Sequence, residues 1–371
     1  MSSIISENMR EYKEIYSLEG RTLETGWKVL HRIEPKSNRQ KGKYSVCYMV
    51  EKDGKQRFMK VMDINEHIRH LEPGESRADV FKRVLNQYTY ERDVCNLCKG
   101  KHLSNVTIVL DAGEESLDDN VYVPMYYLVF EKADGDVIDA MEDSAKLDFA
   151  WRLRSLHSVA VGLQQLHTAG ITHEDIKPSN ILTFDKKQTT KVGDLGCSTC
   201  ETIHSPFEED PFPGDHNYAP PERSYHYHIE DLRLSKRLTD CYLLASLITY
   251  YITGTSLNAL IMQYMPETHK PDVFSGTFHD VKNYLDVAFS NALESLRADI
   301  PYKEIEDIII GIVRQLGDPD PNRRCREENN DIQSTGSQIE KAITSLDLAC
   351  TKSEILIRKE LQRKNESISK T

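Results

Sequence analysis

The chain has 371 residues, of which 39% are hydrophobic and 29% are charged, and its formal net charge is −12. This composition is typical of a soluble globular protein, and the length allows two or three domains or one large two-lobed domain. The negative charge argues against general nucleic-acid binding, which needs clustered Lys and Arg to neutralise phosphates.

The sequence predicts neither a signal peptide nor a membrane-spanning segment. The N-terminal sequence MSSIISENMREYKEIY has no apolar stretch long enough for a signal peptide. The longest apolar run, Tyr242 to Ile252, is about half of what a membrane span requires. We therefore expect a cytoplasmic protein with neither nucleic-acid nor membrane partners. Nothing in the sequence specifies an oligomeric state.

The chain contains 8 Cys, too few for a disulfide scaffold at this length. Two pairs have CxxC spacing, namely Cys95/Cys98 and Cys197/Cys200. A four-thiolate zinc site is conceivable, but no Gly-rich knuckle surrounds either pair. Free thiols in a reducing compartment are the simpler interpretation.

The first half of the chain predicts short strands and one helix. Strands are expected in WKVLHRI (27–33), in SVCYMVEKDGKQRFMKVMD (45–63), where EKDG supplies a hairpin turn, and in MYYLVF (125–130). The stretch DVFKRVLNQYTYERDVCNLC (79–98) has apolar residues at helical spacing. They are Val80, Val84, Leu85, Tyr88, Val94 and Leu97.

From about residue 145 the pattern becomes helical. FAWRLRSLHSVAVGLQQLHTAG (149–170) predicts one amphipathic helix ended by Gly170, and DCYLLASLITYYITG (240–254) predicts a buried helix, because it is apolar nearly all round. SQIEKAITSLDLA (337–349) offers a capping box at Ser337 and Glu340 and predicts a docking helix. The polar residues from about 360 to 371 are expected to be frayed.

The chemistry of the chain is concentrated in ITHEDIKPSNIL (171–182) and KVGDLG (191–196). An Asp–Asn pair and a further Asp, brought together, are hard oxygen ligands of the kind that Mg²⁺ prefers. A Lys beside them can hold a phosphate, while Asp175 is free to orient a hydroxyl and accept its proton. These are the requirements of phosphoryl transfer, which depends on positioning, metal and charge neutralisation.

The motifs then resemble those of one family. HEDIKPSN is similar to the catalytic loop His-Arg-Asp-x-Lys-x-x-Asn of eukaryotic-type (Hanks-type) protein kinases, and DLG is similar to their Asp-Phe-Gly. The remaining motifs follow in the family's order. They are FMKV with Lys60, YERDVCNLC with Glu91, YAPPE (218–222), TDCYLLAS with Asp240, and DPNRR (320–324), whose Arg324 is the expected partner of Glu222. On these motifs the chain is identified as a member of the serine/threonine protein kinase family, and its form resembles stand-alone bacterial members.

The resemblance implies an α+β, bilobal protein-kinase-like fold with a small, mostly-β N-lobe containing one helix and a larger, mostly-α C-lobe. Residues 1–25 would be an N-terminal extension, 26–132 the N-lobe, 133–350 the C-lobe and 351–371 a C-terminal helical tail. It also implies ATP and Mg²⁺ as cofactors and a protein, the chain itself included, as substrate. Lys177, two residues after Asp175, is the pattern of Ser/Thr rather than Tyr kinases.

The resemblance also implies a role for each motif residue. Lys60 would hold the α- and β-phosphates with Glu91 holding Lys60, Asp175 would orient the acceptor hydroxyl, and Lys177 would steady the γ-phosphate. Asn180 and Asp194 would bind Mg²⁺, backbone groups near Glu131 and Ala133 would take the adenine edge with Phe130 behind them, Leu182 would lie under the base, and Gly42 belongs to the phosphate loop. His173 is expected to be structural, packed under Leu195.

Four departures from the family pattern bear on these roles. Only Gly42 is kept in the phosphate loop, with Gln40 and Ser45 at the flanking glycine positions. Phe58 replaces the expected Ala beside adenine, and we expect it to pack against the phosphate-loop strands. Glu174 replaces the Arg of His-Arg-Asp, where it would repel a phosphate on Ser198, Thr199, Thr202 or Ser205, and Asp215 replaces a Thr. The acidic segment 206–215 is either solvated or selects basic substrates.

Two alternatives to an active protein kinase follow. The Gly-poor loop and Phe58 suit a pseudokinase, a binding module with this fold, but a scaffold has no use for the complete metal- and phosphate-handling set. A small-molecule phosphotransferase would share the Asp and Asn, yet it has no need of YAPPE or of a Glu222–Arg324 ion pair. The sequence therefore favours a Ser/Thr protein kinase.

Overall fold

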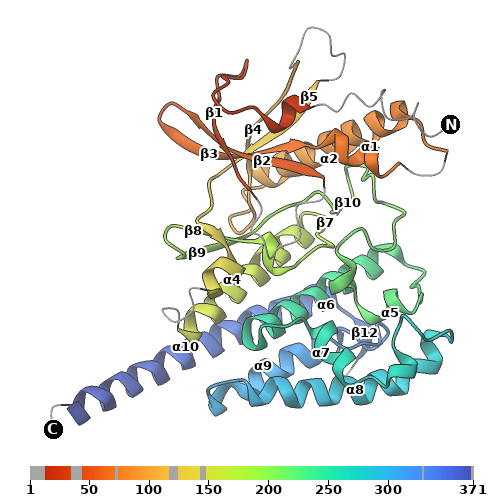
Figure 1. Cartoon of the computed structure of the whole chain (residues 1–371). Coiled ribbons are helices and arrows are strands. Elements are labelled where there is room, and N and C mark those ends of the chain that lie inside the picture. Colours follow the sequence, from red (N-terminus) through yellow and green to blue (C-terminus); the bar gives the residue numbers. More distant parts are fainter. Residues whose placement is uncertain are drawn as a thin grey trace. The chain divides into compact units, whose positions relative to one another are not determined.

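A computed structural model of the chain describes residues 13–34, 44–71, 74–116, 124–142, 148–327 and 330–368. The chain divides into two compact units. Unit 1 comprises Met1–His102, Thr107–Ala133 and Ile203–Pro206, and unit 2 comprises Leu103–Val106, Asp134–Thr202 and Phe207–Thr371. Unit 1 is built on a sheet and unit 2 on helices, as Figure 1 shows for each, so the α+β class is confirmed.

Unit 1 contains a five-stranded antiparallel sheet in the order β1-β2-β3-β5-β4. Its strands are β1 (Lys28–Arg32), β2 (Ser45–Lys52), β3 (Lys55–Met62), β4 (Val109–Glu115) and β5 (Met125–Phe130). Asp53 and Gly54 join β2 to β3 with φ of 52° and 71°. Positive φ at both central residues is what a tight hairpin requires, so the predicted EKDG turn is confirmed.

The helical elements in the described part of unit 1 are η1 (Lys13–Tyr16), α1 (Ile64–Arg69) and α2 (Arg77–Gly100). The predicted helix around residues 79–98 is α2, which begins with a capping box between Ser76 and Asp79. Of its expected apolar stripe, Val80, Val84, Tyr88 and Val94 are buried, whereas Leu85 is exposed.

The core of unit 1 lies on one face of the sheet. Alternate residues of β2 and β3, among them Tyr48 and Met59, are fully buried, as a period of two requires. Ile15 and Leu18 belong to the same core, and the Tyr48 hydroxyl donates to the Ile15 carbonyl at 2.6 Å. The described part of the segment before residue 26 is therefore packed onto the sheet.

Unit 2 is mostly helical. Its helices are α3 (Val137–Glu142), α4 (Phe149–Thr168), α5 (Pro221–Ser224), α6 (Leu232–Thr253), α7 (Leu257–Tyr264), α8 (Phe278–Ala298), α9 (Lys303–Leu316) and α10 (Thr335–Ile368), with short 3₁₀ turns η3 (Pro178–Asn180), η4 (His216–Tyr218) and η5 (Glu267–His269). Its short strands are β6 (Gly135–Asp136), β7 (Ile171–Thr172), β8 (Ile181–Phe184), β9 (Thr189–Val192), β10 (Thr199–Cys200), β11 (Arg326–Glu327) and β12 (Asn330–Gln333). The two predicted long helices are α4 and α6.

Helix α6 is buried along most of its length, as its apolar sequence predicts. It ends at Gly254, whose φ of 79° is the left-handed conformation that favours glycine at a helix C-terminus. Within the described ranges, no single helix is both long and apolar enough to cross a membrane. Helices α6 and α7 meet the length and composition requirement only as a pair bent by 80°.

Helix α10 differs from its prediction at both ends. It begins at Thr335, where the Ser334 carbonyl accepts the first helical hydrogen bond from Gln338. Ser337 therefore lies inside the helix, and the predicted capping box is wrong. The helix runs on to Ile368, so the fraying expected from about residue 360 is wrong as far as that residue, and residues 369–371 lie outside the described residues (dark blue in Figure 1). The docking prediction is confirmed, because α10 packs along α4 and α9.

The 8 cysteines all lie within the described ranges, and none of them forms a disulfide bond. Cys95 and Cys98 are buried in α2, and Cys197 and Cys200 are half-buried in unit 2. Among the described residues, no group of three or more His, Cys, Asp or Glu side chains is arranged to hold a metal ion.

Candidate active site

The loop after β7 is fixed by one buried carboxylate, that of Asp240 on α6. Its two oxygens accept hydrogen bonds from the backbone N–H of His173 at 2.8 Å and from that of Glu174 at 2.7 Å. His167 on α4 lies 2.8 Å from the same carboxylate through Nε2. Glu174 has a φ of 63°, a conformation that costs free energy in a residue other than glycine. The paired N–H bonds hold it there.

Asp175 is held from three directions. Its Oδ1 accepts from the Asp215 N–H at 2.9 Å, and its Oδ2 accepts from Nδ2 of Asn180 at 2.9 Å and lies 3.0 Å from Nζ of Lys177. Burial raises the pKa of the Asp175 carboxyl, while Lys177 and the Asp215 N–H oppose the rise. The carboxylate is therefore oriented before any substrate binds.

Lys177 lies between two carboxylates. Its ammonium is 3.5 Å from Oδ2 of Asp215 in addition to its contact with Asp175. Burial lowers the pKa of Lys177, but the two carboxylates outweigh burial, so the pKa is raised and the side chain stays charged. Asp215, which replaces a Thr of the family pattern, thus pairs with Lys177 as a carboxylate can.

Asn180 and Asp194 are brought together by the β8–β9 hairpin, in which Ile181 pairs with Val192. The Gly193 N–H donates to the Asn180 carbonyl at 2.8 Å, which places the two residues side by side. Nδ2 of Asn180 is used by Asp175, and the amide oxygen, which has only a long contact of 3.5 Å from the Ser179 hydroxyl, is the group suited to a metal ion. Together with the exposed Asp194 carboxylate it forms a hard oxygen donor set, which fits Mg²⁺.

His173 is buried and hydrogen-bonded, and its expected packing under Leu195 stays a prediction. Its Nε2 lies 2.9 Å from the Gly193 carbonyl, and its Nδ1 receives the Asp175 N–H at 3.2 Å. The imidazole therefore connects the 171–182 loop to the residue before Asp194.

Sequence reasoning missed the surroundings of Glu174. The side chain is completely buried, and its Oε2 faces Nζ of Lys236 on α6 at 3.3 Å. Its Oε1 lies 2.9 Å from the Thr172 hydroxyl and 2.7 Å from the Thr199 hydroxyl. Burial raises the pKa of Glu174 to about 7, against the opposing effect of Lys236. One signal was present, because Lys236 lies one helical turn before Asp240.

The other predicted residues are distributed over both units. In unit 1, Nζ of Lys60 on β3 donates to the Glu91 carboxylate on α2 at 2.9 and 3.0 Å. Glu131 and Ala133 follow β5 in unit 1, and Leu182 is in β8 of unit 2. The remaining phosphate-loop residue, Gly42, lies outside the described residues.

Phe58 lies on the same face of the sheet as Lys60, because the two are separated by one residue of β3. Its cross-strand neighbours are Met49 on β2 and Phe130 on β5, and the Phe58 and Phe130 rings are 6.5 Å apart. The Phe58 side chain is only half-buried. It therefore stands outside the fully buried core, which includes its neighbour Met59 on the opposite face.

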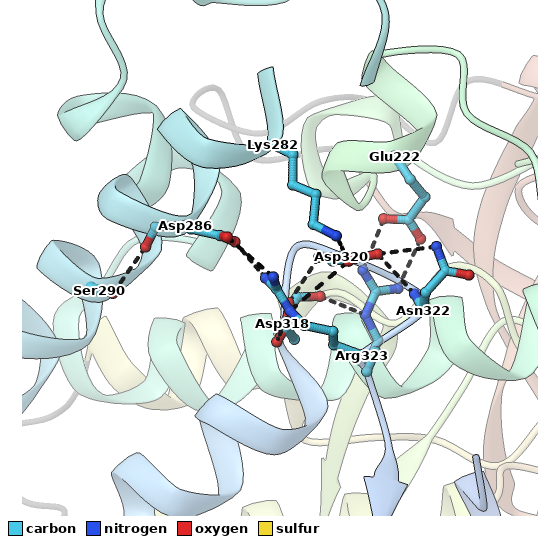
Figure 2. A network of polar contacts seen from close by, with 9 residues as sticks. Glu222, Lys282, Asp286, Ser290, Asp318, Asp320, Asn322 and Arg323 are labelled. Carbon is cyan, nitrogen blue, oxygen red and sulfur yellow. Dashed lines mark hydrogen bonds and ion pairs between the residues drawn. The ribbon is translucent and has the colours of Figure 1, made fainter. Parts of the chain in front are cut away.

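A second polar network in unit 2 contains the predicted Glu222–Arg324 pair. The two terminal guanidinium nitrogens of Arg324 donate to the Glu222 carboxylate at 2.8 Å. Around this pair, Arg323 binds Asp286 and Asp318, and Lys282 binds Asp320, as Figure 2 shows. The network joins the start of α5, helix α8 and the 318–324 loop. The segment that begins at Asp194 ends at Glu222, and the network fixes that end.

A sheet unit with a Lys–Glu pair, and a helical unit with Asp, Lys, Asn and Asp on adjoining loops, define the protein kinase class of fold. The model of the protein kinase domain family matches residues 40–326, and the chain belongs to that family.

Curated relatives are similar over shorter stretches. Human serine/threonine-protein kinase greatwall is 28% identical over 159 residues, which is 43% of this chain and 16% of that protein. A probable serine/threonine-protein kinase of Streptomyces coelicolor is 31% identical over 121 residues, 32% of this chain and 17% of that protein. This chain thus spans about a sixth of the length of these relatives.

Gly214 allows the 194–222 segment to approach the Asp175 loop. A Cβ at this position would overlap the Glu174 carbonyl oxygen and lie 3.2 Å from Oδ1 of Asp175. We expect Gly214→Ala to lower the free energy of unfolding by about 1–3 kcal/mol, because backbone must move. Gly311→Ala in α9 is the matched control, since nothing lies within 4 Å of its Cβ, and it should be neutral or stabilising. Urea denaturation of both variants measures the difference, and equal stability would contradict the close approach.

The buried Glu174 predicts a pH dependence of stability. Its pKa is about 7 in the folded chain against an ordinary value of 4.5, so folding takes up a proton between these pH values. The free energy of unfolding should therefore fall as pH rises from about 4.5 to 7. The double variant Glu174→Gln/Lys236→Met lacks both charges but keeps Asp240, Thr172 and Thr199 around the site. Denaturation curves across this range should show a steeper fall for wild type, and parallel curves would refute the buried titration.

Proposed function

We propose that the chain is an active, ATP- and Mg²⁺-dependent protein kinase that transfers the γ-phosphate to Ser or Thr hydroxyls of proteins. The observation that carries the proposal is the orientation of Asp175 by the Asp215 N–H, Asn180 and Lys177 in one loop system. A carboxylate held in this way is prepared to align an acceptor hydroxyl and to receive its proton.

The remaining polar residues suit the phosphates. In the proposed reaction the acceptor oxygen bonds to the γ-phosphorus, the bond from that phosphorus to the ADP oxygen breaks, and the hydroxyl proton passes to Asp175. Lys60, which is paired with Glu91 at 2.9 Å, is suited to bind the α- and β-phosphates. Lys177 is suited to the transferring phosphoryl group, because it already bridges two carboxylates. Asn180 and Asp194 would hold Mg²⁺, which neutralises phosphate charge.

The main alternative, a pseudokinase, is favoured by one observation. Phe58 lies beside Phe130 on the Lys60 face, where the family pattern places a small residue near adenine. Against it, the Lys60–Glu91 pair and the Asp175 contacts are all formed, and a binding scaffold has no need of either. The Glu222–Arg324 pair likewise supports a protein rather than a small molecule as acceptor.

The chemistry is tested by two isosteric substitutions. Asp175→Asn should lower the rate of phosphoryl transfer by roughly 10²- to 10⁴-fold while sparing ATP binding, because it removes the proton acceptor. Asp194→Asn should instead weaken Mg²⁺-dependent ATP binding. Autophosphorylation and transfer to a Ser/Thr peptide library measure the rate, and calorimetry measures binding. Asp299→Asn, at the exposed end of α8, is the control. Wild-type rates in both site variants would end the assignment.

The role of Phe58 separates an enzyme from a scaffold. We expect wild type to bind Mg-ATP, and Phe58→Ala to lower stability without improving that binding. The loss should be about 1–3 kcal/mol, below the range for a fully buried ring, because Phe58 is half-buried. Phe149→Ala, which removes a half-buried ring 6.2 Å from Tyr302 in unit 2, is the matched control for stability. Micromolar binding by Phe58→Ala, with none by wild type, would favour the pseudokinase.

A further inference from the structure

Glu174 and Lys236 form a buried ion pair that the proposed reaction does not use. The Glu174 side chain is completely buried, and Lys236 is 5% exposed. Buried charges are costly to desolvate, and removing one member of such a pair leaves the other uncompensated. The importance of such a pair therefore depends on which neighbouring groups it holds in place.

The pair contacts the segment that begins at Asp194 at two separate places. Oε1 of Glu174 lies 2.7 Å from the hydroxyl of Thr199, and strand β10, which starts at Thr199, pairs with β7. Nζ of Lys236 donates to the carbonyl of Phe207 at 3.1 Å. One acid on the catalytic loop and one base on α6 therefore hold positions 199 and 207 of this segment.

In these contacts the negative charge lies on the loop before Asp175 and not on the segment that begins at Asp194. Kinase segments of this type are commonly ordered by phosphorylation, through a new contact between the phosphate and Arg. Here a carboxylate stands directly before Asp175, its cation is supplied from α6, and the segment contributes a neutral hydroxyl. A phosphate on Thr199 would bring a second anion to an oxygen that now lies 2.7 Å from the Glu174 carboxylate.

We propose that Glu174 and Lys236 are positioning residues whose ion pair keeps strand β10 and Phe207, all within unit 2, in their working arrangement without phosphorylation, and that phosphorylation of Thr199 disrupts this arrangement. The proposal rests on the proposed kinase function for its effect on rate. Its structural part, that the pair holds β10 against β7, is independent of any activity. The two parts are therefore measured separately.

The central variant is Glu174→Gln/Lys236→Met, which removes both charges and leaves no uncompensated one. A merely structural pair predicts a stable double variant with the wild-type rate. The proposal predicts a folded double variant with faster hydrogen exchange in the peptide that covers β10. It also predicts a kcat roughly 10- to 100-fold lower, the scale of a misplaced catalytic group, with the KM for ATP nearly unchanged. Assays at pH 8 keep Glu174 ionised in wild type.

Two single substitutions keep the proposal testable if the double variant does not fold. Thr199→Glu, which places an anion beside Glu174, should accelerate exchange in β10 and lower kcat. Thr202→Glu is the matched control, because Thr202 is exposed three residues further on, and it should change neither quantity. Equal behaviour of these two variants would overturn the proposal.

The last experiment uses the wild-type protein. After phosphatase treatment, verified by intact mass, wild type should keep its full rate, and loss of that rate would overturn the proposal. A wild type with no phosphoryl transfer at all would refute the proposed function instead. In that case the exchange of β10 in the double variant still decides the structural part, where wild-type protection would contradict it.

Discussion

The carboxylate of Asp240 is the interaction on which the rest of unit 2 depends. It accepts two consecutive backbone N–H groups, those of His173 and Glu174, and contacts His167 as well. Two successive donors can meet one carboxylate only if the chain turns sharply between them, and Glu174 accordingly adopts a left-handed φ. This turn buries the Glu174 side chain and leaves the next residue, Asp175, among polar partners. A single buried acid thus sets the environments of two adjacent carboxylates.

Each of the two environments contains two carboxylates and one lysine, but they differ in how exposed they are to solvent. Glu174 and Asp240 are fully buried beside Lys236, whereas Asp175 and Asp215 flank a Lys177 side chain that is 21% exposed. In the buried group the hydroxyls of Thr172 and Thr199 donate to Oε1 of Glu174, while Oε2 faces Lys236 across an ion-pair distance of 3.3 Å. In the outer group Lys177 has two carboxylates and remains accessible. The first arrangement is suited to holding the chain and the second to holding a substrate.

The sequence predicted those features that depend on neighbouring residues. The β2–β3 hairpin follows from Asp53 and Gly54, and α4 and α6 follow from apolar spacing and a terminal glycine. Helix α10 was misplaced because its start depends on which carbonyl accepts the first helical bond, and its final turns contain good helix formers in spite of their polarity. In the site, ordered motifs predicted the Lys60–Glu91 pair although the two residues are far apart in the chain.

The network around Glu174 shows why the remainder was not predicted. Lys236 precedes Asp240 by four residues, so it lies on the same face of α6, and Asp240 was already expected to anchor this part of the fold. What the sequence does not specify is that the Glu174 side chain is buried, since the same residue in an open loop would be solvated and would need no cation. Burial here follows from the turn that Asp240 imposes and from the pairing of β10 with β7, both of which join segments distant in sequence. Sequence reasoning therefore missed the pairing of Glu174 with Lys236, because tertiary contacts and not the local sequence pattern decide which buried charges must be paired.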